Sequence, residues 1–425
     1  MTKYQFIGIL MLNVTQQYRL RPSMKLLKNL TLIGPGFVVA ATGLGAGDLV
    51  AAAVSGASLG GQIIWAVVFG ALIKLALNEG LARWQLSTGT SILQGWQQHL
   101  PRWVNSYFLI YLLLWGFLVG AALMAACGLA ANALFPQLSI NSWAVLHSLL
   151  AVLLVLFGRY SVFESAMKVL ILLMFTTVMA ALASLDLSGI NLQQTLLADT
   201  GVQSHDNMVL AVIGGVGGSV TLLCYGYWMR EKAWHSSAAL PLARVDLIVA
   251  YTITALFGIG IMLLAAKAAP ATIQGNQVLV AMADELGRTL SPVFREVFLL
   301  GVWAAVFSSM LGVWQGVPYL FADIMATRSK SKQRAAADQN SWAYRGFLGY
   351  LALPPMLLLL LGKPVWLVML YAVTGAFFMP FLALTLLYLN NRIITKAHRF
   401  GIGSNILIIL ALIVFGFLSL QSLFN

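Results

Sequence analysis

The sequence has little charge and few cysteines for its length. Of its 425 residues only 9% are charged, and Cys127 and Cys224 are its two cysteines. A soluble domain of this size needs more charge to keep its surface in water. Two cysteines set apart in apolar segments supply neither a disulfide framework nor a cysteine metal site. The sequence also contains no nucleophile elbow, phosphate-binding loop or zinc-protease motif, so we expect neither an enzyme nor a bound cofactor.

Apolar residues, by contrast, are abundant. They form 60% of the chain and raise its mean hydropathy to +0.87. A window of about 20 such residues is long enough to cross a bilayer. Windows of this kind predict an all-α polytopic membrane protein with about eleven transmembrane helices. The predicted spans are 31–55, 62–83, 105–130, 141–158, 163–185, 208–229, 245–267, 297–322, 345–361, 365–390 and 402–423.

The basic residues indicate how the chain is oriented. The formal net charge is +12, and with a cytoplasmic N-terminus most Lys and Arg residues fall on inner segments, as the positive-inside rule requires. We therefore expect residues 1–30 to be a cytoplasmic segment and 31–425 to be one transmembrane domain in a bacterial inner membrane. The basic inner loop 328–345 either sets this topology or binds anionic lipid, and 268–294 is expected to be an outer loop. Because no compact basic domain exists, we expect no nucleic acid partner.

Two of the predicted spans contain clusters of glycine at mid-depth. Gly43, Gly45 and Gly47 interrupt the first span, and the run Gly214–Ser219 interrupts the sixth. Glycine permits backbone conformations outside the helix, so we expect both spans to unwind there. Interrupted spans at corresponding places in two halves of a membrane protein indicate a substrate site between them.

The interrupted spans also divide the chain into two blocks of five. We predict a first repeat at 31–185, a second repeat at 208–390 and an extra helix at 402–423. Because five is odd, the second block enters the membrane in the opposite direction to the first. Inverted repeats of this kind are typical of secondary transporters.

Asp48 is the first candidate site residue, because it is a carboxylate directly after the glycines of the first break. It either caps the following half-helix or handles a proton or a cation, and the two roles are compatible. Gly45 contributes free backbone groups beside it. In the sixth span, Gly218, Ser219 and Thr221 offer carbonyls and hydroxyls to the same site.

Lys74 is the second candidate, because it lies deep in the second predicted span. An unpaired ammonium there costs about 2.5 to 3.5 kcal/mol. We expect Asp48 to be its partner, or else Glu79, and the pair to be either a structural salt bridge or a coupling switch. Glu79 and Arg83 lie four residues apart, a spacing that favours an ion pair sealing an inner gate.

A second pair, Glu164 and Lys168, repeats that spacing in the fifth span. Tyr225 in the sixth span is expected either to pack with its hydroxyl satisfied or to donate to a substrate. Gln315 in the eighth span is a further buried polar candidate for coupling or gating, and Asp323 lies near the inner end of the same span.

The chain resembles the Nramp family of proton-coupled divalent-metal transporters, which have the LeuT fold. The resemblance rests on Gly34-Pro-Gly-Phe37, on Ala82-Arg83 with Thr88-Gly89, on the glycine-rich opening of the sixth span and on Met379-Pro-Phe381. It implies an inverted 5+5 repeat with broken helices 1 and 6, and a metal site between them.

The sequence departs from the family at the metal-binding positions. In register with the family motifs, the metal-binding Asp falls on Gly45 and the neighbouring Asn on Asp48. The Met and His of the sixth span fall on Gly218 and Val220, and a downstream His falls on Tyr225. A thioether favours transition metals over magnesium or calcium, so its loss argues against selective binding of manganese or iron. Asp48 is the remaining metal candidate, for a hydrated hard cation.

The sequence therefore predicts a divergent Nramp-like secondary transporter that works by alternating access. Its cargo is a cation, nominally a divalent metal, coupled to protons. Two alternatives stay open: a small organic solute carried on the same fold, and a sensor or scaffold that does not transport. The expected partners are the lipid bilayer and one small inorganic ion or small solute.

Overall fold

The computed structural model describes residues 34–185, 206–268, 277–328 and 338–424. Every regular element among these residues is a helix, as the sequence predicts. The predicted cytoplasmic segment 1–30 and most of the connection between the fifth and sixth predicted spans lie outside the described residues. The same holds for the start of the basic loop 328–345.

Six long helices form most of the bundle. They are α5 (Ile64–Thr88), α7 (Trp103–Leu134), α8 (Ile140–Phe157), α9 (Tyr160–Ser184), α13 (Leu240–Ala268) and α15 (Pro292–Arg328). Large apolar side chains on their outer faces stay exposed, among them Ile110, Leu114, Val169 and Leu172. Continuous apolar surface of this kind is unfavourable in water, and in a bilayer it faces lipid.

Two predicted spans consist of shorter helices separated by a break. The first contains α3 (Pro35–Gly43) and α4 (Ala46–Leu59), whose axes differ by 52°. The sixth contains α11 (Asp206–Gly215), a short 3-10 turn (Val220–Cys224) and α12 (Tyr225–Glu231). The prediction that spans 1 and 6 are broken is confirmed.

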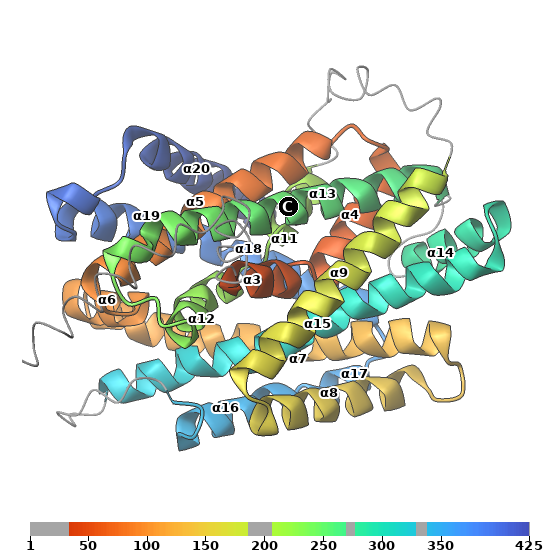
Figure 1. The fold of residues 1–425 in the computed structure, drawn as a ribbon, viewed down its shortest axis with the longest axis horizontal. Coiled ribbons are helices and arrows are strands. Elements are labelled where there is room, and N and C mark those ends of the chain that lie inside the picture. The colour runs from red at the N-terminus through yellow and green to blue at the C-terminus, as the bar shows by residue number, and fades with distance from the viewer. Residues whose placement is uncertain (1–33, 186–205, 269–276, 329–337, 425) are drawn as a thin grey trace, which may run out of the picture. The chain divides into compact units, whose positions relative to one another are not determined.

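The broken helices lie inside the bundle. In Figure 1, α5 and α13 lie on one side of α3, while α7, α8 and α15 lie on the other. The helix contacts agree, since α13 packs against α3, α4 and α5, and α15 packs against α3, α7 and α9. Five tryptophans are fully buried between these helices, namely Trp84, Trp96, Trp115, Trp228 and Trp314.

The C-terminal part is more segmented than the sequence analysis expected. The span predicted at 345–361 is two pieces, α16 (Trp342–Ala352) and α17 (Met356–Leu359), because Pro354 and Pro355 lack the amide hydrogen that a continuous helix needs. The span predicted at 365–390 is α18 (Pro364–Ala376) followed by α19 (Phe378–Tyr388). The last helix is α20 (Ile402–Phe424).

Two helices lie where none was predicted. α6 (Ile92–His99) follows α5, and Ser91 caps it by accepting the amide hydrogen of Gln94. α14 (Gln277–Thr289) lies in the connection 268–294 that is expected to be an outer loop, so this connection contains a helix. A search for windows of 20 apolar residues cannot detect helices this short.

The number of spans stays a prediction. Within the described residues, eight helices are long and apolar enough to cross a membrane, and the bent pair α3–α4 makes nine. The segments 345–361 and 402–423 supply the rest of the predicted eleven. The first contains the short helices α16 and α17, and the second contains α20, whose part Ile402–Phe417 is apolar but shorter than a span.

Candidate functional site

The break in the first span is produced by close packing. A Cβ atom on Gly43 would lie 2.7 Å from the carbonyl carbon of Gly217, and one on Gly45 would lie 2.2 Å from the Oγ of Ser309. No side chain fits at either position. Gly45 is also the N-cap of α4, and its φ of −91° is one that residues with a side chain adopt. Glycine is therefore required here by the contact with neighbouring atoms and not by the backbone conformation.

The break in the sixth span is produced by backbone conformation. Gly217 and Gly218 have φ angles of 75° and 80°, in the region that L-residues with a side chain avoid. The Gly218 amide donates to the carbonyl of Gly215 at 3.1 Å, which closes a tight turn. The chain then continues as the 3-10 turn that leads into α12.

Asp48 joins the two breaks. It is buried in the first turn of α4, and its Oδ2 accepts the amide hydrogen of Gly217 at 2.9 Å. The expectation that Asp48 caps its own half-helix is therefore wrong, because Gly45 is the N-cap of α4. The carboxylate instead satisfies a backbone donor that the break in the sixth span leaves free.

Lys74 holds the same segment of the sixth span from α5. Its ammonium is fully buried and donates to the carbonyl of Gly214 at 3.1 Å and to that of Gly218. The expected direct pairing with Asp48 is replaced by these two carbonyls, although the charges of Asp48 and Lys74 are close enough to interact. The alternative partner, Glu79, pairs instead with Arg83 at 2.6 Å and with Arg244 at 2.9 Å.

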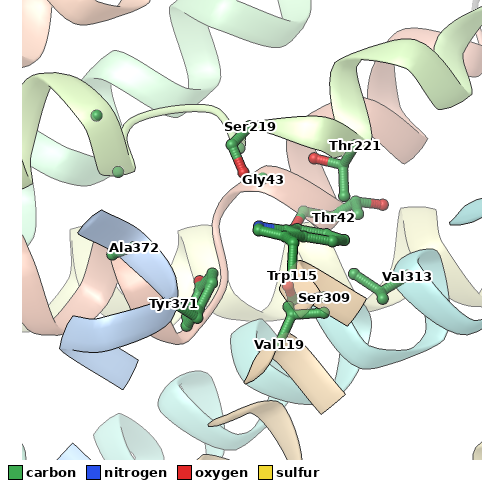
Figure 2. Close-up of a pocket in the computed structure, with 13 residues that line it drawn as sticks. Thr42, Gly43, Trp115, Val119, Ser219, Thr221, Ser309, Val313, Tyr371 and Ala372 are labelled. Carbon is green, nitrogen blue, oxygen red and sulfur yellow. The ribbon is translucent and has the colours of Figure 1, made fainter. Parts of the chain in front are cut away.

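A small cavity lies between the two breaks. Its volume is about 20 Å³, which is room for one water or one small ion. Among the predicted site residues, Gly218, Ser219 and Thr221 line this cavity, whereas Gly45 and Asp48 do not. Figure 2 shows the lining side chains gathered around the ring of Trp115.

Several polar residues of the cavity wall were missed by the sequence analysis. Ser309 on α15 donates its hydroxyl hydrogen to the carbonyl of Thr42 at 2.7 Å. Tyr371 on α18 accepts the amide hydrogen of Gly47 at 3.0 Å. The indole N–H of Trp115 is buried and has no hydrogen-bond partner among the described residues. Single Ser, Tyr and Trp residues in apolar spans give no sequence signal that separates them from ordinary packing residues.

The cavity is a poor match for a transition-metal site. No carboxylate, histidine or thioether side chain is among its lining residues. Across the part of the chain that the structure describes, no group of three His, Cys, Asp or Glu residues is placed to hold a metal. The oxygens available to a cation are hydroxyls and backbone carbonyls, which are hard ligands.

Tyr225 links the α12 half-helix to the start of α3. Its hydroxyl donates to Oδ2 of Asp246 at 2.9 Å, and the same oxygen accepts the amide hydrogen of Gly36 at 2.6 Å. Asp246 is fully buried on α13. The sequence analysis did not single out Asp246, although a carboxylate at the edge of an apolar span is a recognisable signal. Tyr225 thus connects two half-helices and does not line the cavity.

Gln315 and Asp323 bind α12 to α15. The Oε1 of Gln315 accepts the indole hydrogen of Trp228 at 2.6 Å. Asp323, which is fully buried, accepts hydrogen bonds from Tyr227 at 2.8 Å and from Ser91. Gln315 therefore holds α12 against α15 and does not line the cavity.

Ion pairs gather at the end of the bundle where α12 lies, which we call the α12 end. The predicted pairs Glu79–Arg83 and Glu164–Lys168 both form, each at 2.6 Å. Glu164 also binds Lys232, just after α12, at 2.8 Å. Together with the pair that Arg244 makes with Glu79, these contacts tie α12 and α13 to α5 and α9.

An apolar helix bundle in which two broken helices meet around a small polar cavity is the architecture of a secondary transporter. The chain belongs to the Nramp family, because the model of natural resistance-associated macrophage protein-like proteins matches residues 36–425. The protein is accordingly a transporter and not an enzyme.

Solved structures agree on the fold. The crystal structure of the Eremococcus coleocola manganese transporter in complex with an aromatic bis-isothiourea substituted compound has a TM-score of 0.75 at 14% identity, covering 93% of this chain and 86% of that one. MhsT in complex with L-phenylalanine has a TM-score of 0.55 at 17% identity, with coverage of 91% and 97%. Mhp1, a nucleobase-cation-symport-1 family transporter, has a TM-score of 0.57 at 13% identity, with coverage of 92% and 91%. No curated protein matches the chain.

Proposed function

We propose that this protein is a secondary active transporter that moves a small cation, nominally a divalent metal ion, by alternating access with coupling to protons. The observation that carries the proposal is the cavity of about 20 Å³ between the two breaks. This volume suits one ion or one water. An organic solute of amino acid size does not fit it in this conformation.

The proposed ligands of the cation are oxygens of the cavity wall. Ser219, Thr221 and Ser309 present hydroxyl groups there, and the unwound segments add backbone carbonyls. Hard cations such as magnesium or calcium prefer oxygen ligands of this kind. The similar fold of the Eremococcus coleocola manganese transporter supports a divalent ion as cargo. The oxygen ligands of this chain favour a harder cation than manganese, such as magnesium or calcium.

Asp48 is the proposed proton carrier or charged ligand. It lies behind the cavity wall, bound to Gly217, so it reaches the cargo only when the two breaks separate. Breaking that hydrogen bond leaves the carboxylate free to take a proton or to approach a cation. The coupling of cargo to protons would then follow from movement of the sixth span relative to α4.

The ion pairs at the α12 end mark the proposed cytoplasmic side. Arg83, Lys168, Lys232 and Arg244 gather there, in agreement with the positive-inside rule. With this orientation the N-terminus is cytoplasmic. A bacterial inner membrane is the proposed location.

Uptake into liposomes tests the proposal. Purified protein should accumulate one or more of Mg²⁺, Ca²⁺ and Mn²⁺ when a pH gradient is applied, and Asp48→Asn should remove that uptake. Glu285→Gln is the matched control, because it removes a carboxylate that pairs with Arg288 on α14. Uptake that survives Asp48→Asn would exclude Asp48 from the mechanism.

A small organic solute is the second candidate. The unpartnered indole N–H of Trp115 favours it, since a solute oxygen can accept that hydrogen and a cation cannot. Calorimetry with divalent ions separates the two candidates. Binding of an ion supports the first, and failure of every ion to bind while a small acid or amide binds supports the second.

A further inference from the structure

The carbonyls at the break in the sixth span have an unusual partner. α11 ends at Gly215, so the carbonyl of Gly214 belongs to its last turn and that of Gly218 to the unwound segment. Carbonyls at the end of a helix lack intrahelical partners and carry partial negative charge. In transporters with broken helices, such carbonyls coordinate the coupling ion, Na⁺ or H⁺. Here both accept hydrogen bonds from the ammonium of Lys74.

The surroundings of Lys74 fit a position for a cation. The residue is fully buried in the middle of α5, where an uncompensated charge is expensive. The carboxyl group of Asp48 on α4 interacts with this ammonium and binds the amide of Gly217, which lies between Gly214 and Gly218 in the sequence. The ring of Phe415 on α20 lies 5.8 Å from the ammonium and adds a cation–π contact.

The unwound segment is therefore bound on two sides, its amide by the carboxyl group of Asp48 and its carbonyls by the ammonium of Lys74. Its amide hydrogen points at an anion, and its carbonyls point at a cation. A sodium ion bound to the two carbonyls would supply the same positive charge, but it would leave whenever its concentration fell. A lysine supplies the charge without that dependence.

We propose that the Lys74 ammonium is a tethered monovalent cation that takes the place of a free alkali ion at the break in the sixth span. The transporter then needs no sodium or potassium at this position. Removing the ammonium would open a site that accepts a small monovalent cation from solution. This inference does not depend on which cargo the protein carries.

Thermal unfolding of the purified full-length chain in detergent tests the inference. Wild-type protein should have the same melting midpoint in choline, sodium, potassium and methylammonium chloride at equal ionic strength. Lys74→Ala should melt several degrees lower in choline chloride, and one of the small cations should restore at least half of that loss with saturation. Because melting is measured without cargo, failure of this test is distinct from failure of the proposed transport activity.

Two further variants keep the test decisive. Lys168→Ala removes a lysine that pairs with Glu164 on α9, so its midpoint should not depend on the salt. Lys74→Arg keeps a cation and should also show no dependence on the salt. A Lys74→Ala protein whose midpoint is the same in all four salts would overturn the inference, and so would a wild-type protein stabilised by sodium or potassium. If Lys74→Ala yields no folded protein, then a salt-independent wild type and Lys74→Arg support the inference, and a salt dependence in either overturns it.

Discussion

Both breaks interrupt a helix next to the cavity, but different interactions stabilise them. In the first span the helical hydrogen bonds run up to the break and resume directly after it, since the amide of Leu44 still donates to Ala40 at 2.8 Å and that of Leu49 to Gly45 at 3.1 Å. Gly45 between them is extended, with φ of −91° and ψ of −157°. In the sixth span Gly217 and Gly218 leave the helical region altogether. One break is fixed by what packs against it, and the other is fixed by charges that bind its exposed peptide groups.

This difference predicts which kind of substitution disrupts each break. Added volume should disrupt the first span, where Gly43 and Gly45 contact backbone and side chain of neighbouring elements. Removed charge should disrupt the sixth span, where Asp48 and Lys74 hold the segment. Three experiments separate the two mechanisms.

The largest effect is expected for Gly43→Ala. The new methyl group would lie 2.7 Å from the carbonyl carbon and 2.9 Å from the Cα of Gly217, and backbone atoms cannot rotate away as a side chain can. We expect a loss of about 1–3 kcal/mol in the free energy of unfolding and a loss of cargo uptake. Melting and liposome uptake measure both.

A matched control exists on α16. Gly346 has open space around the position of its missing Cβ, so Gly346→Ala should leave uptake unchanged and should slightly favour the helix. Equal damage from Gly43→Ala and Gly346→Ala would mean that the contact between the two breaks is unimportant.

The sequence predicted the breaks because glycine clusters in apolar spans are a local signal. It also predicted the charged residues near them, Asp48 and Lys74, because a charge in an apolar span is conspicuous. It could not predict their partners. The partners are backbone groups of Gly214, Gly217 and Gly218. Because nearly every residue has the same backbone groups, the sequence does not show which of them bind a side chain.

Other misses have different physical reasons. The Pro354-Pro355 pair was visible in the sequence, but an apolar window continues across it. α14 is shorter than a membrane span, so hydropathy alone could not find it. Part of the cavity wall was missed because Thr42, Ser309 and Tyr371 meet only in the folded bundle.

A double-mutant cycle on Asp48 and Lys74 should give the next largest effect. Asp48→Asn and Lys74→Met each leave the opposite charge buried without compensation, which is costly in an apolar interior. The double variant removes both charges, so its loss of stability should be smaller than the sum of the single losses. The expected coupling is about 0.5–3 kcal/mol, measured from the unfolding free energies of the four proteins.

The two side chains act through one backbone segment, so the cycle measures whether the effect of one depends on the other. A coupling energy near zero would mean that each charge supports the sixth span independently. The same cycle applied to Lys168→Met and Glu164→Gln reports on an ion pair at the α12 end, where the ammonium is 37% exposed. Its coupling should be smaller, since solvent screens a partly exposed pair.

The smallest effect is expected for Ser309→Ala, and its neighbour provides the control. Both serines of α15 are placed to donate to carbonyls at the end of α3, Ser309 to Thr42 at 2.7 Å and Ser308 to Ala41 at 3.0 Å, although the single hydroxyl hydrogen of Ser308 is shared with the carbonyl of Ala305 at 2.9 Å. Only Ser309 lines the cavity. Each change to Ala should therefore cost a similar 0.5–1.5 kcal/mol, roughly the net contribution of one hydrogen bond.

The two variants should differ in transport. Ser309→Ala removes an oxygen from the cavity wall, so it should raise the KM of uptake several-fold with little change in the maximal rate. Ser308→Ala should leave the KM unchanged. A KM that rises equally in both variants would show that the serines act only by holding α3 against α15, and the cargo would then bind elsewhere than in the cavity between the breaks.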